Sequence, residues 1–108
     1  MKTTLQILTD ARALLKGGGK WCKGANARGL RGTPVDPNGK YAVCFCAQGV
    51  LLRVAGRQGI FGAKTALQNF TLPMTLLEFN DQSHRTKREV IDLFTQAIKA
   101  ERKHERHA

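Results

Sequence analysis

The sequence of 108 residues has no long apolar segment, few cysteines and a single serine. Its longest apolar runs, around Val50, span only a few residues, whereas a membrane helix needs roughly 20, so we expect no membrane partner. Three cysteines cannot all pair with one another, and Met1 to Thr4 opens no charged and then apolar leader. We therefore expect reduced thiols and a cytoplasmic protein.

Acidic residues are scarce too, most of all in the middle of the chain. Lysine and arginine number 18 against 8 Asp and Glu, which gives a formal net charge of +10. Between Ala11 and Lys64, ten basic residues face a single acid, Asp36, so this stretch alone carries +9. A block of one sign attracts polyanions at low salt. It also offers no pair of carboxylates for general acid–base catalysis.

The run Gly17-Gly18-Gly19-Lys20 lacks the other features of a phosphate-binding loop. The nucleotide-binding motif has a glycine five residues before its Gly-Lys pair, and Ser or Thr after the lysine. Leu14 and Trp21 occupy those positions here. The only serine, Ser83, lies in a turn-like segment with no hydrolase motif around it. We therefore expect neither nucleotide hydrolysis nor a serine nucleophile.

Three cysteines and one histidine, Cys22, Cys44, Cys46 and His84, match the number of ligands in a zinc site. Cys44 and Cys46, however, are predicted to lie in one helix, where their spacing turns the two thiols roughly 200° apart. Buried small hydrophobes explain the cysteines better, and no third residue is placed to orient a Cys and His pair. We predict no metal, no cofactor, no catalytic residue and no small-molecule substrate, and hence a protein that is not an enzyme.

Apolar periodicity predicts an all-α fold, a compact single domain of four to five helices. Thr3 with Gln6, and Thr86 with Glu89, have the spacing of capping boxes, and apolar stripes at helical spacing follow each pair. The predicted helices cover residues 3–16, 41–55, 61–70 and 86–100, with a short turn at 73–77. A long glycine-rich basic loop, residues 17–40, joins the first two helices. We place the domain at residues 1–100 and expect 101–108 to be a charged, frayed tail.

Two groups of polar or aromatic residues have competing explanations. Trp21 stands between Lys20 and Lys23, an arrangement that can stack a base while the cations hold the backbone. A lone tryptophan at a loop edge more often fills the core, and both interpretations stay open. A second group is Asn80, Asp81, Arg85, Thr86 and Glu89. Helix capping and an ion pair between Asp81 and Arg85 explain this group without a ligand.

The charge pattern predicts a small basic, non-enzymatic binding protein that engages nucleic acid or a nucleoprotein. Binding would neutralise phosphates and release counterions, and no residue pattern indicates base-specific readout. The alternative is a protein–protein interaction factor, such as a phage or mobile-element modulator, that docks on an acidic host protein. The predicted contact residues are Lys16, Lys20, Trp21, Lys23, Arg28, Arg31, Lys40, Arg53 and Arg57.

Three segments also resemble the motifs of a known family. Residues 21–28 resemble W-x-x-G-x-x-A-R, residues 45–51 resemble W-C-A-x-G-A-L, and residues 79–90 resemble W-N-D…R-T-x-x-E-V. The departures are Phe45 and Phe79 in place of Trp, Val50 in place of Ala, and a lysine- and arginine-rich loop where members of the family are often neutral or acidic. These motifs belong to a family of small uncharacterised bacterial and phage proteins, a domain of unknown function. The resemblance implies a compact helical fold and a bacterial or phage setting, and it transfers no catalytic residue.

Overall fold

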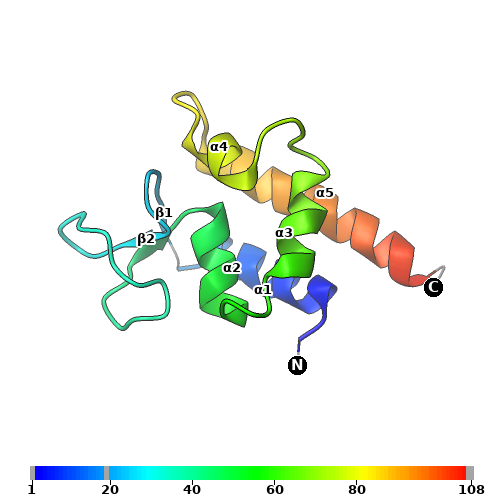
Figure 1. The fold of residues 1–108 in the computed structure, drawn as a ribbon, viewed down its shortest axis with the longest axis horizontal. Helices are drawn as coiled ribbons and strands as arrows, with labels where there is room; N and C mark the ends of the chain where they lie inside the picture. The colour runs from blue at the N-terminus through cyan, green and yellow to red at the C-terminus, as the bar shows by residue number, and fades with distance from the viewer. Residues whose placement is uncertain (1, 19, 107–108) are drawn as a thin grey trace.

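A computed structural model describes residues 2–18 and 20–106 of the chain (Figure 1). Gly19, in the predicted loop, and residues 107–108, in the predicted tail, lie outside the described residues. Within the described ranges the chain forms five helices and three short strands. The helices are α1 (Thr4–Lys16), α2 (Ala47–Ala55), α3 (Phe61–Gln68), α4 (Leu76–Asp81) and α5 (Lys87–Arg106). The strands are β1 (Lys20–Trp21), β2 (Ala27–Arg28) and β3 (Cys44–Phe45).

The predicted all-α fold is wrong, because the three strands form a small mixed sheet and make the protein mixed α/β. The central strand, β3, pairs in parallel with β1 and antiparallel with β2. Each strand has only two residues. Strands this short produce no alternation of apolar and polar residues, so hydrophobic periodicity cannot reveal them. Two of them lie inside the predicted loop 17–40 and the third inside the predicted helix 41–55.

Helix α2 begins later than predicted because Cys46 caps it. Cys46 has extended backbone angles (φ −80°, ψ 177°), and its Sγ accepts the N–H of Gly49 at 3.3 Å. The apolar stretch 41–55 is thus divided between β3 and α2. A short buried strand and a buried helix have the same apolar character, which explains the error.

Both predicted capping boxes are confirmed. The Thr3 hydroxyl accepts the N–H of Gln6 at 3.1 Å, and the Gln6 side chain accepts the N–H of Thr3 at 2.8 Å. Thr86 and Glu89 exchange the same pair of bonds at 3.2 and 2.9 Å, at the start of α5. The α5 helix then continues to Arg106, past the end of the apolar stripe that predicted it.

The last two residues of the turn predicted at 73–77 belong to a helix, α4, which starts after a third capping box. Thr75 accepts the N–H of Glu78 at 3.2 Å, and Glu78 accepts the N–H of Thr75 at 2.9 Å. Accepting that backbone N–H lowers the pKa of Glu78. Together the three boxes fix the first turns of α1, α4 and α5 independently of the core.

The hydrophobic core lies between α1, α2 and α5. Leu8, Leu15, Leu51 and Phe94 are fully buried there, and α1 and α5 run antiparallel, tied by a 2.8 Å bond from Arg12 Nε to Thr95 Oγ1. Figure 1 shows the strands and the long loop between β2 and β3 gathered at one end of the molecule, while α5 extends away at the other. Among the described residues, no helix has the length and apolar character needed to cross a membrane.

We expect Gly49→Ala to lower the free energy of unfolding by about 2–3 kcal/mol, because a Cβ at Gly49 would overlap the backbone carbonyl of Asn26. That carbonyl cannot move freely, since it accepts the N–H of Cys46 at 3.1 Å. Urea denaturation followed by circular dichroism measures the change. Gly18→Ala is the matched control, because its Cβ would enter open space. Equal stability of the two variants would contradict this packing.

Candidate functional site

The predicted loop folds into an ordered unit that we call the basic lobe, residues 20–45, from the start of β1 to the end of β3 (Figure 1). Main-chain bonds close it against the sheet: Cys22 donates to the carbonyl of Phe45 at 3.1 Å, and Val43 donates to the carbonyl of Arg28 at 2.9 Å. The lobe therefore presents its cations on a backbone of fixed shape.

Two of the predicted contact residues hold the lobe together with their guanidinium groups. Arg28 donates from Nε and Nη2 to the carbonyl of Lys23 at 3.1 and 3.0 Å, and from Nη1 to the carbonyl of Gly32 at 2.8 Å. Arg53 on α2 reaches across and donates from Nη1 to the carbonyl of Gly39 at 2.9 Å. Donors satisfied by carbonyls in this way stabilise the loop.

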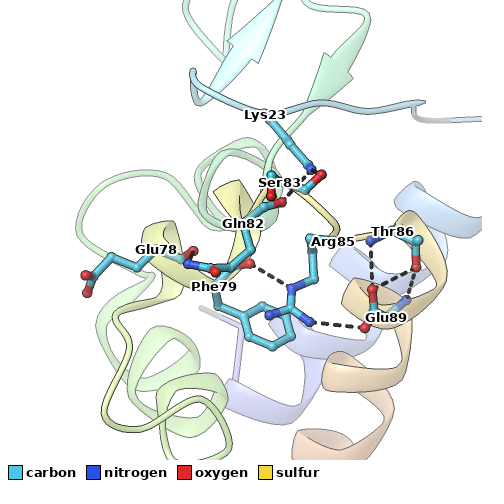
Figure 2. Close-up of polar contacts among 8 residues, drawn as sticks. All are labelled: Lys23, Glu78, Phe79, Gln82, Ser83, Arg85, Thr86 and Glu89. Atoms are coloured by element: carbon cyan, nitrogen blue, oxygen red, sulfur yellow. Dashed lines mark hydrogen bonds and ion pairs between the residues drawn. The ribbon is translucent and has the colours of Figure 1, made fainter.

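Lys23 attaches the lobe to the end of α4. Its ammonium group donates to the carbonyl of Gln82 at 2.6 Å and to that of Ser83 at 3.2 Å. Figure 2 shows the lysine side chain crossing from the lobe to these two carbonyls. The segment after α4 thus binds Lys23, one of the residues predicted from the sequence to contact a partner.

The five other predicted cations are exposed: Lys16, Lys20, Arg31, Lys40 and Arg57. The ion pairs found among the described residues include none of the five. The lobe's only acid, Asp36, accepts the N–H of Asn38 at 2.9 Å inside its own turn. Lys16 ends α1 just before the lobe, and Arg57 follows the far end of α2. The result is a set of exposed cations around a segment whose own residues include one carboxylate.

Trp21 packs into the base of the lobe. Its ring lies against the hydrophobic core, and its Nε1 donates to Oδ1 of Asn80 at 2.6 Å. The ammonium of Lys23 lies 5.4 Å from the ring centroid. Of the two interpretations that the sequence left open, this geometry is that of a core-filling tryptophan.

Tyr41 is an exposed aromatic residue that sequence reasoning missed. Its side chain is 68% exposed, and the ammonium of Lys40 lies 5.2 Å from its ring centroid. The apolar pattern predicts Tyr41 in a helix, but α2 begins at Ala47. An aromatic ring beside a cation at the surface has the chemistry that stacks an unpaired base.

A fully buried amide, Asn80, joins three parts of the chain. Its Oδ1 accepts the Nε1–H of Trp21 at 2.6 Å and the N–H of Ala47 at 2.9 Å. Its Nδ2 donates to the carbonyl of Cys22 at 3.1 Å and to Asp81 Oδ1 at 2.9 Å. One side chain thus connects β1, the first residue of α2 and the end of α4. No local sequence signal reveals this role, because three of its partners are distant in sequence.

The predicted ion pair between Asp81 and Arg85 does not form. Asp81 Oδ1 instead accepts the N–H of Gly24 at 3.0 Å and so holds a residue whose φ of +80° favours glycine. Arg85 pairs with Glu89 at 3.1 Å and lies 3.7 Å from the centroid of the Phe79 ring (Figure 2). The polar group around Asn80 is therefore fully engaged in holding the lobe and capping α5.

The cysteines lie in an environment that keeps two of them protonated at neutral pH. Burial, reinforced by the neighbouring Cys44 thiol, raises the pKa of Cys22 to about 12. Burial also raises the pKa of Cys46. Because the thiolate is the nucleophile and the metal ligand, these shifts disfavour both kinds of chemistry. In the part of the chain that the structure describes, no three His, Cys, Asp or Glu side chains gather as a metal site.

One comparison with known proteins finds a match. A family model described as "Family of unknown function (DUF6197)" matches residues 1–100. No curated protein and no solved structure matches the chain significantly. The match covers α1 to α4, the whole basic lobe and most of α5.

We expect Asn80→Ala to lower the free energy of unfolding by about 3 kcal/mol or more, because it leaves Trp21 Nε1, the Ala47 N–H and the Cys22 carbonyl without partners. Denaturation followed by the emission of Trp21, the only tryptophan, reports both the stability and the breaking of its bond to Asn80. The control is Asn69→Ala, an exposed asparagine. An Asn80 variant as stable as this control would show that the amide does not hold the lobe.

Proposed function

The chain belongs, over residues 1–100, to a family of unknown function, and we propose that it is a small non-enzymatic protein that binds nucleic acid through the basic lobe. The observation that carries this proposal is that some of the predicted cations bind carbonyls of the protein itself and the others do not. Lys23, Arg28 and Arg53 are bound to carbonyls of the protein itself, and the other predicted cations are exposed. Arg53 is exposed too, but its guanidinium is engaged, so the cations available to a polyanion are the five that no carbonyl of the described residues binds.

The order of the lobe supports this use of its charge. A flexible basic segment loses conformational entropy when it binds, which weakens its affinity. Here the backbone that carries Lys20, Arg31 and Lys40 is already held by the sheet and by Arg28. The exposed side chains alone need ordering when they meet phosphates, so the charge of the lobe can be used at lower entropic cost.

Phosphate contacts explain affinity, and Tyr41 adds a preference for unpaired bases. Lysine and arginine neutralise phosphates and release counterions, which makes binding fall steeply with salt. An exposed ring next to Lys40 can stack any base, because every base has a π-face. We therefore propose single-stranded nucleic acid as the preferred form, bound without base-specific readout.

We expect Arg31→Gln/Lys40→Gln to weaken binding about tenfold at low salt. The slope of log affinity against log salt should also fall, by about 0.7–0.9 for each phosphate that the variant no longer neutralises. Fluorescence anisotropy with labelled single strands and duplexes, at several salt concentrations, measures both quantities. The matched control is Lys2→Gln/Lys64→Gln, which removes two charges outside the lobe.

Two results would contradict the binding of nucleic acid through the lobe. If the control weakens binding as much as the lobe variant, affinity follows net charge and not the lobe. If the wild-type protein binds neither probe at low micromolar concentration in low salt, nucleic-acid binding is excluded. The same exposed cations would then serve the alternative function, docking on an acidic protein.

We expect Tyr41→Ala to weaken binding of single strands about tenfold and to leave duplex binding unchanged, because removing the ring that stacks a base costs about 1–3 kcal/mol. Tyr41→Phe keeps the ring and should bind both probes like the wild type. The same anisotropy assay separates the two variants. Equal losses of affinity for single strand and duplex would contradict stacking at Tyr41.

A further inference from the structure

A basic groove lies between the second half of α1 and the first turns of α5, outside the lobe. It encloses about 410 Å³ and is lined by Arg12, Lys16, Lys87, Arg88, Ile91 and Asp92. We infer that this groove binds the phosphate groups of the same nucleic-acid strand that the lobe engages. The inference rests on the proposed function and extends it to a second, unassigned surface.

The groove concentrates positive charge from two distant parts of the chain. Four of its six lining residues are cations and one, Asp92, is a carboxylate. Arg12 is oriented by its Nε bond to Thr95 Oγ1 at 2.8 Å, while its terminal nitrogens are not bound by that interaction. Asp92 offsets one of the four positive charges, and the cations that remain repel one another unless a further anion lies between them.

The position of Arg88 argues for an anionic ligand as well. It lies in the first turn of α5, where the partial positive charge of the helix terminus disfavours cations. The acid of that turn, Glu89, is directed to Thr86 and Arg85 (Figure 2). Its carboxylate therefore compensates the helix terminus and Arg85, not the groove.

A second hollow continues along the same helix pair and favours a strand over a compact phosphate. It encloses about 310 Å³, shares Arg12 with the first groove, and includes Lys99 and Arg102. At 1.5 Å per residue, Arg88 and Arg102 lie about 21 Å apart along α5. One phosphate occupies one hollow, whereas a nucleic-acid backbone spans both.

Lys16 connects the groove to the lobe. It lines the groove and ends α1, four residues before Lys20 begins β1. A strand lying along α1 and α5 is therefore led by Lys16 toward Lys20 at the start of the lobe.

The experiment compares Arg88→Gln/Arg102→Gln with Arg31→Gln/Lys40→Gln and with the control Lys2→Gln/Lys64→Gln, all of which remove two charges. Anisotropy uses a labelled single strand long enough to span both surfaces. We expect the Arg88/Arg102 pair to weaken binding about tenfold and to lower the salt slope by about 0.7 for each phosphate left unneutralised, with the melting temperature unchanged. The control should bind like the wild type.

Three other results would contradict binding in the groove, the proposed function, or a strand as the ligand. If the Arg88/Arg102 pair binds like the control while the lobe variant is weakened, the groove is overturned and the proposed function stands. If the wild type binds no nucleic acid, the proposed function itself fails. A third result has two parts: Arg88→Gln alone accounts for the whole effect, and inorganic phosphate displaces the strand better than chloride of equal ionic strength. The groove then holds a compact phosphate, and the inference that it binds a strand is wrong.

Discussion

The buried side chain of Asn80 is the interaction on which the basic lobe depends. Strands of two residues do not hold a sheet by themselves, since even an isolated hairpin is marginal in water. Asn80 bonds at once to β1, through Trp21 and Cys22, and to the first residue of α2, Ala47. These bonds need two acceptor sites and two donors on one side chain, which an amide has and a carboxylate lacks. The lobe is therefore attached to the helical core by a group that only Asn or the longer Gln can supply.

The attachment explains why the cations of the lobe have two roles. A glycine-rich segment loses much conformational entropy on folding, so it needs several bonds to stay ordered. Arg28, Lys23 and Arg53 supply them by donating to backbone carbonyls of the lobe and of the α4 end. Once these three are engaged, the exposed cations project from a fixed backbone. Lysine and arginine thus both hold the lobe together and remain available for binding, and only their hydrogen-bond partners distinguish the two roles.

Sequence reasoning succeeded where the signal is local and failed where it is not. The boxes at Thr3 and Thr86 were predictable because each partner lies three residues away. The strands were not, because pairing between β1 and β3 joins residues 24 apart in register and leaves no periodic trace. Asn80 was recognised as polar and structural, but its bonds to Trp21 and Ala47 depend on how the chain folds back. The resemblance to an uncharacterised family could be proposed from the sequence alone, and a family model matches residues 1–100.

The net charge of a segment does not show where its charges lie in space, because their positions also depend on how the chain folds. The segment after Lys64 is nearly neutral in sequence, yet its acids Glu78 and Glu89 accept backbone N–H groups at the starts of α4 and α5. Those bonds lower the pKa of both carboxyls, so each stays ionised and faces the positive end of its own helix. The neighbouring Arg88 is left to combine with Arg12 of α1 in one groove. A balanced count in one segment is thus compatible with an excess of cations in one groove, where one acid, Asp92, lies beside four cations, because Glu78 and Glu89 face the starts of their own helices.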